Sequence, residues 1–96
     1  MELKAITYDS KNSTWKDHKE YNHMFIYVQE RYIKDLLRSR GYIYLNQIYE
    51  LLNAKWNPDD DNLCFRYDGV NNKKLIEFEI FDQEDNSILI HILYHE

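Results

Sequence analysis

Apolar side chains recur at steps of three and four residues between residues 21 and 37, and this pattern constrains the fold of the 96-residue chain more than any other feature. Such spacing predicts an amphipathic helix that begins near Asn22 and ends at Ser39 or Arg40. Gly41 follows, and glycine readily adopts the left-handed conformation that closes a helix. The residues expected to form the buried stripe are Tyr21, Met24, Phe25, Val28, Tyr32, Leu36 and Leu37.

Residues 42–45 alternate tyrosines with aliphatic residues, which predicts a short extended segment after this helix. Asn46 is then the expected N-cap of a second helix, because its side-chain oxygen can accept a hydrogen bond from a free amide of the next turn. That helix should end near Ala54, before Pro58. Gly41 and Asn46 therefore form the expected structural hinge between the two helices.

Alternation with a period of two replaces the helical pattern elsewhere in the chain. An opening strand is expected at residues 2–9, and three more strands are expected at 63–67, 74–81 and 87–95. Turn-forming residues separate the last three, which predicts an antiparallel meander. The sequence thus predicts an α+β fold of one domain over residues 1–96, with two helices packed on one face of a mostly antiparallel sheet of three to four strands.

The composition is that of an ordinary globular domain, with 44% hydrophobic and 30% charged residues. No apolar run approaches the roughly 20 residues that cross a bilayer, so we expect a cytoplasmic protein without membrane contact. Cys64 is the single cysteine, which excludes a disulfide within the chain.

No motif with known chemistry stands out. Asn57, Asp59 and Asp61 alternate like the ligands of a calcium loop, but Asn62 occupies the position that requires glycine. Two glycines in the whole chain do not suffice for a phosphate-binding loop. We therefore expect no metal, no cofactor, no catalytic residue and no enzymatic activity. A small enzyme that uses the carboxylates of its strands is the least favoured alternative.

The order helix, extended segment, helix and hairpin resembles a winged helix, which leaves nucleic-acid binding as an alternative. Such proteins gain most of their affinity by neutralising phosphates with Lys and Arg. Residues 1–58 carry nine basic and seven acidic side chains, and residues 59–96 carry three and ten, which gives net charges of +2 and −7. The expected second helix has no Lys or Arg and carries Glu50, so this pattern disfavours nucleic acid.

Acidic residues of the second half form the expected partner-binding surface, together with exposed tyrosines. Negative charge steers and complements a basic protein partner, which an inhibitor or immunity factor would use. The oligomeric state and the partner's identity stay open. The seven carboxylates are Asp59, Asp60, Asp61, Glu77, Glu79, Glu84 and Asp85.

The segment "RYIKDLLRSRGYIYLNQIYELLNAKW", residues 31–56, resembles short proteins of unknown function from bacteriophages and mobile elements of low-GC Gram-positive bacteria. The shared pattern is a helix ending in Leu-Leu, the glycine Gly41, an aromatic and aliphatic extended piece, Asn46, and a helix with Tyr49 and paired leucines. The later strand "IEFEIFD" also matches. The resemblance covers half to two thirds of the chain, is structural in character and brings no catalytic residue.

Overall fold

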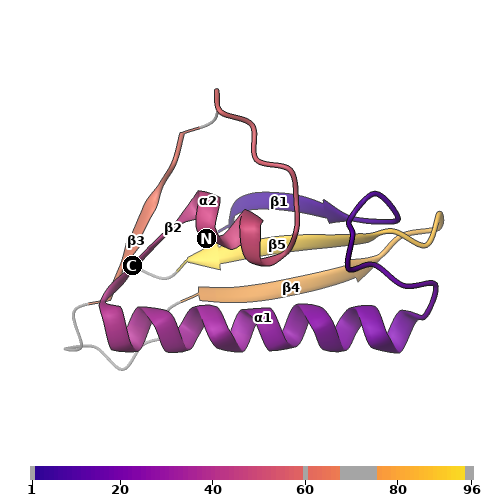
Figure 1. The fold of residues 1–96 in the computed structure, drawn as a ribbon, viewed down its shortest axis with the longest axis horizontal. Helices are drawn as coiled ribbons and strands as arrows, with labels where there is room; N and C mark the ends of the chain where they lie inside the picture. The colour runs from indigo at the N-terminus through magenta and orange to yellow at the C-terminus, as the bar shows by residue number, and fades with distance from the viewer. Residues whose placement is uncertain (1, 60, 68–75, 95–96) are drawn as a thin grey trace.

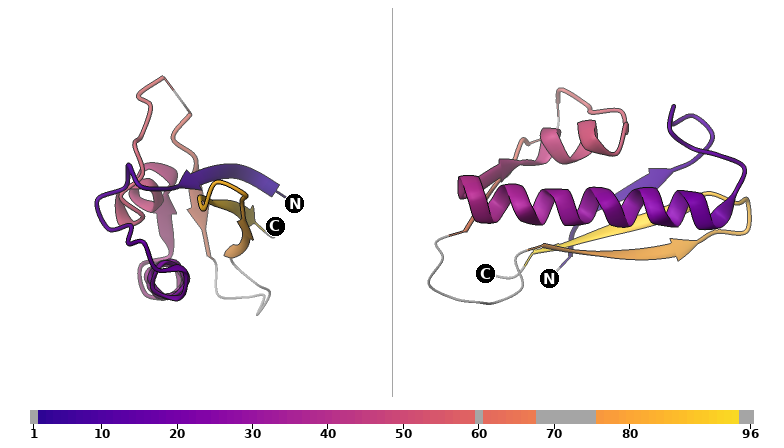
Figure 2. Two further views of the ribbon diagram at one scale, coloured as in Figure 1. Left: turned by 90° about the vertical axis from the view of Figure 1, so that its right-hand side faces the viewer. Right: turned by 60° about the horizontal axis from the view of Figure 1, so that its bottom comes forward.

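The computed structural model describes residues 2–59, 61–67 and 76–94, which form two helices and five strands (Figure 1). The α+β class and the antiparallel pairing are confirmed, although the strands number five and form two sheets. Both helices lie on the same side of the larger sheet (Figure 2). The elements are β1 (Glu2–Tyr8), α1 (Lys19–Arg40), β2 (Tyr42–Tyr44), α2 (Leu45–Leu51), β3 (Cys64–Arg66), β4 (Ile76–Asp82) and β5 (Ile88–Tyr94).

The larger sheet has the order β1-β5-β4, and β2 pairs with β3 in a separate sheet. The predicted meander is therefore wrong in one strand, because the segment at 63–67 does not pair with β4. The third strand of the larger sheet is β1, which pairs with β5. β3 pairs with β2 because Ile43 and Phe65, which are both buried, lie opposite each other in that register. Backbone bonds at its two ends, from the amide of Leu45 to the carbonyl of Leu63 and from Tyr67 to Gly41, extend the pairing.

The two faces of the larger sheet differ as the alternation predicts. Ile76 and Phe78 of β4 are buried on the inner face, whereas Glu77 and Glu79 lie on the outer face. The inner face meets the helices, and β2, α2 and β3 complete the same core. The core residues of the sheet are Ile6, Tyr8, Ile76, Phe78, Ile88, Ile90 and Ile92, and those of the remaining elements are Ile26, Ile33, Leu37, Ile43, Leu45, Ile48, Tyr49, Leu52 and Phe65.

The buried face of α1 differs from the predicted stripe. Of that stripe only Leu37 is fully buried, Phe25 and Leu36 are partly buried, and the other members are exposed. The helix also begins earlier than predicted, at Lys19, because the Nδ1 atom of His18 accepts a hydrogen bond from the amide of Tyr21. The residues that α1 buries are Asn22, Ile26, Glu30, Ile33 and Leu37.

The polar members of this buried face have backbone partners. Asn22 accepts a hydrogen bond from the amide of Lys16 at 2.8 Å and donates one to the carbonyl of the same residue at 2.6 Å. Glu30 accepts a hydrogen bond from the amide of Phe78 at 2.8 Å. Burial of a polar side chain costs little free energy when its polar atoms are hydrogen-bonded. α1 can therefore bury this face instead of the more apolar stripe that the sequence predicts.

Gly41, the first residue of the corner after α1, has the left-handed conformation that the sequence predicts. Gly41 has a φ of 86°, in the left-handed region, and its amide donates to the carbonyl of Leu37 at 2.8 Å. β2 is the short extended segment predicted for residues 42–45, and α2 then turns over the core.

The predicted N-cap of α2 is wrong. Tyr44 occupies that position, and its amide donates to the side-chain oxygen of Gln47 at 2.9 Å. The amide of Asn46 itself is capped by the side chain of Asn62, at 2.9 Å. α2 also ends earlier than predicted, at Leu51, because Asn53 takes a left-handed φ of 54°.

Candidate functional site

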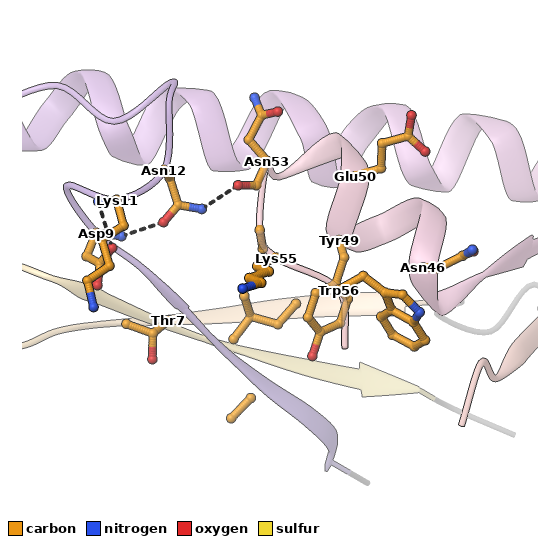
Figure 3. Close-up of a pocket in the computed structure, with 13 residues that line it drawn as sticks. Thr7, Asp9, Lys11, Asn12, Asn46, Tyr49, Glu50, Asn53, Lys55 and Trp56 are labelled. Atoms are coloured by element: carbon orange, nitrogen blue, oxygen red, sulfur yellow. Dashed lines mark hydrogen bonds between the residues drawn. The ribbon is translucent and has the colours of Figure 1, made fainter. Parts of the chain in front are cut away.

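An open cleft of about 780 Å³ lies between β1 and the C-terminal part of α2 (Figure 3). Its volume falls within the range of about 300–1,000 Å³ that is typical of ligand sites. Residues 5–7 of β1 line one side, and Asn46, Tyr49 and Glu50 of α2 line the other. The segment after α2 adds Trp56, so the cleft joins residues that are far apart in the sequence.

Asn12 holds the two sides of the cleft together (Figure 3). Its side-chain oxygen accepts from the amide of Asp9 at 2.9 Å, and its side-chain amide donates to the carbonyl of Asn53 at 2.9 Å. The second of these bonds spans 41 positions of sequence. Asn12 is buried and its two bonds are partly buried, and together they fix the loop after β1 against the end of α2. The cleft is therefore preformed.

Tyr49 and Trp56 form an aromatic side of the cleft. Their ring centroids are 5.0 Å apart and the ring planes meet at 78°, an edge-to-face arrangement. Tyr49 is buried and fixes the orientation of Trp56, which is only half-buried. A rigid indole with one accessible side offers apolar contact area at a low cost in conformational entropy.

The charged groups of the cleft balance one another. Asp9 and Glu50 contribute two carboxylates, and Lys11 and Lys55 contribute two ammonium groups. The carboxylate of Asp9 also accepts from the amide of Lys11 at 2.9 Å and so shapes the loop. The cleft therefore has no concentration of charge of one sign. A site for a phosphate group or a metal ion would need such a concentration.

The β1 side of the cleft is the edge of a sheet. β1 pairs with β5 along one side, and residues 5–7 border the cleft. An edge strand presents alternate backbone N–H and C=O groups away from its neighbour. The cleft thus combines main-chain hydrogen-bonding groups with an aromatic surface.

Of the seven carboxylates predicted to bind a partner, the six that the structure describes do not form one patch. Asp59 and Asp61 lie in the segment between α2 and β3, at the top of Figure 1, and Asp60 lies outside the described residues. Glu77 and Glu79 lie on the outer face of β4. Glu84 and Asp85 lie in the turn between β4 and β5, at the right of Figure 1.

Two of these carboxylates have structural partners. Asp85 accepts from the amide of Ser87 at 3.0 Å and from its hydroxyl at 2.6 Å, and these bonds lower the pKa of Asp85. The carboxylate of Glu77 lies 3.4 Å from the ammonium of Lys34. A role of any of the seven in binding a partner stays a prediction.

Across the described ranges, no group of three or more His, Cys, Asp or Glu side chains is placed to hold a metal ion. Neither helix of those ranges has the length and apolar character that a membrane span requires.

The residues of the cleft were not predicted from the sequence. Asn12, Asn53 and Trp56 show no periodicity that links them to β1, because the connection is made by long-range hydrogen bonds of Asn12 to the carbonyls of Leu52 and Asn53. The sequence contains one local sign of the aromatic side of the cleft. Tyr49 and Trp56 lie close together in the chain, on either side of Asn53, which has a left-handed φ.

Residues 2–94 match the family of unknown function DUF6353. The chain belongs to this family. Neither a curated protein nor a solved structure matches the chain. The DUF6353 match includes both helices and all five described strands, so the cleft lies within the part of the chain that defines the family.

Proposed function

We propose that this DUF6353 protein is a protein-interaction module that binds an extended segment of a partner protein in the cleft beside β1. The observation that supports this function is the placement of an edge strand and an aromatic surface on opposite sides of one preformed cleft. Extended peptides bind sheet edges through main-chain hydrogen bonds, and pockets for alternate side chains supply the specificity.

The contacts available in the cleft define the class of peptide. Its backbone would add to the edge at residues 5–7, and one apolar side chain would lie against Trp56. Glu50 and Lys55 are both exposed at the cleft, so polar side chains on either side of the apolar one would find charged partners. A short segment with one large apolar residue between polar neighbours fits this description.

The charge of the whole chain favours a basic partner. The net charge is −5 at pH 7, and a field of this sign raises the rate at which a basic protein arrives. The exposed carboxylates of Asp59 and Asp61 follow directly after the cleft in the chain. Replacing both with Asn should slow association with a basic peptide at low salt, and the difference should vanish at high salt.

The proposed setting is the cytoplasm of a cell that carries a bacteriophage or mobile element. This part of the proposal is supported by the resemblance of residues 31–56 to proteins of such elements.

Peptide display tests the proposed binding. A yeast-displayed library of random peptides as long as β1 would be sorted for binding to the purified protein. Trp15→Phe leaves Trp56 as the only tryptophan, so the emission of this variant reports events in the cleft. The substitution should be mild, because the indole nitrogen of Trp15 has no hydrogen-bond partner among the described residues. Selected peptides should shift the emission of this variant and the amide resonances of residues 5–7.

Trp56→Ala should weaken binding of the selected peptides about tenfold or more, as truncation of a central aromatic anchor does. Tyr27→Ala is the matched control, because Tyr27 is an exposed aromatic residue on α1 and does not line the cleft. Equal binding by Trp56→Ala and the wild type would reject the cleft as the binding site.

A further inference from the structure

Four apolar side chains of α1 form an exposed row on the side of the helix that faces away from the core. Their exposed fractions are 45% for Tyr21, 66% for Met24, 55% for Val28 and 50% for Tyr32. Steps of three, four and four residues place them along one side of the helix. We call this row the α1 stripe. Contiguous exposed apolar surface of this kind marks interaction sites.

We propose that the α1 stripe is where a second copy of this chain packs, with the two α1 helices antiparallel about a two-fold axis. This inference goes beyond the proposed function, because no residue of the α1 stripe lines the cleft. A two-fold interface places the same patch of each copy against the other and must therefore be self-complementary.

The order of side chains in the α1 stripe meets this requirement. A tyrosine stands at each end, and Met24 and Val28 stand between them. With the axis near the middle of the stripe, Tyr21 meets Tyr32 of the second copy at both ends. Met24 meets Val28 of the second copy on each side of the axis. Large side chains thus face large ones only at the ends, where aromatic pairs pack favourably edge to face.

The charges beside the α1 stripe are also self-complementary. Glu20 and Arg31 are eleven positions apart and lie on the same flank of the stripe, and both are exposed. An antiparallel arrangement brings Glu20 alongside Arg31 of the second copy, and the symmetry produces this pair twice. A parallel arrangement would instead place this flank of the two copies on opposite sides of the interface, so that Glu20 would not meet Arg31 of the second copy. Charge complementarity of this kind selects the orientation of helix pairs.

The position of α1 in the fold leaves room for this contact. α1 is 22 residues long, and the left view of Figure 2 shows it end-on at the margin of the molecule. The stripe stops at Asp35, whose carboxylate lies 3.7 Å from Arg38 of the same helix. The contact surface therefore covers residues 21–32 of α1, and its centre lies between Met24 and Val28.

Sedimentation equilibrium of the purified chain tests the proposal. The wild type should show a concentration-dependent dimer, and Val28→Lys should stay monomeric. Val28 lies outside the core, so this variant should keep its helical circular dichroism. Ser39→Lys is the control, because Ser39 is also exposed on α1 but lies beyond the stripe. It should dimerise like the wild type. A wild type that stays monomeric up to about 1 mM would overturn the proposal.

Charge reversal tests the orientation. Glu20→Arg and Arg31→Glu should each weaken the dimer several-fold, and the double variant should recover the wild-type affinity, because the antiparallel pairs form again with their signs exchanged. A parallel pair gives a different result, since Glu20 and Arg31 of the two copies then lie on opposite sides of the interface and the single variants break no pair between them. Dimerisation of the single variants at the wild-type affinity would overturn the antiparallel assignment.

Discussion

The carboxylate of Glu30 on α1 accepts a hydrogen bond from the backbone amide of Phe78 on β4, across 2.8 Å and at a buried position. The strand order makes β4 an edge of its sheet, so this amide points away from β5 and toward the helix. Lys34 lies 3.5 Å from the same carboxylate and 3.4 Å from that of Glu77. A helix side chain thus supplies the partner that a neighbouring strand would otherwise provide, and α1 covers this edge.

Glu30→Ala should destabilise the fold by about 1–3 kcal/mol, because it leaves the buried amide of Phe78 without an acceptor. Glu30→Gln retains an oxygen at the same place and should cost less. Urea unfolding at neutral pH measures both free energies. Equal losses for the two variants would show that the charge of Glu30, and not its role as an acceptor, stabilises the contact.

Gly41→Val should cost on the order of 1–2 kcal/mol or more, because a β-branched side chain is strained at the φ of 86° that Gly41 adopts. A Cβ there would lie 3.7 Å from the carbonyl oxygen of Tyr67, an ordinary contact, so the expected cost comes from the backbone and not from a clash. Ser39→Val, at an exposed helical position nearby, is the control. If thermal unfolding of the Gly41 variant matches that of the wild type, the strain argument fails.

Asp82 should make stability depend on pH in acid. Its hydrogen bond to His23, at 2.8 Å, and then its bond to Lys19 hold the pKa of Asp82 below its ordinary 3.8. A carboxyl whose pKa is lowered by folding adds stability above its unfolded pKa, and this contribution is lost as the pH falls through its folded pKa.

Asp82→Asn should therefore be less stable than the wild type at neutral pH, and the gap should close in acid, below the folded pKa of Asp82. Its size should be small, because the side chain of Asp82 is 39% exposed and solvent screens the interaction. Urea unfolding of both proteins at neutral pH and in acid measures the gap. A gap that stays constant would contradict the assignment to Asp82.

Asn12→Ala should destabilise the protein by about 1–3 kcal/mol and weaken peptide binding, since it frees the amide of Asp9 and the carbonyl of Asn53. Asn12→Asp should cost more than Asn12→Ala, because a carboxylate would face that carbonyl. Unfolding and peptide titration report the two effects. Unchanged peptide binding by a folded Asn12→Ala variant would mean that the shape of the cleft does not depend on the hydrogen bonds of Asn12.

The sequence predicted what is decided locally. The alternation around Ile76 and Phe78 predicted β4 and its faces, and Gly41 predicted the end of α1, because each depends on neighbouring residues alone. The strand partner of residues 63–67 depends on which distant edge buries Phe65 best. The pattern of a single strand contains no information about this choice.

The buried face of α1 and the cleft could not be predicted for a related reason. α1 carries apolar residues on two sides, and periodicity favoured the row that includes Val28 and Tyr32 over the one that includes Ile26 and Ile33. The choice is made by tertiary hydrogen bonds of Asn22 and Glu30, which the sequence alone does not show. The cleft likewise depends on the bond of Asn12 to Asn53.

The covered edge at β4 limits how copies of this protein can join through their strands. The amide of Phe78 at this edge is already bonded to Glu30, so it is not available to a strand of another copy. A foreign strand that docks along β4 must first displace this carboxylate. Glu30 therefore acts as a barrier against edge-to-edge stacking at β4.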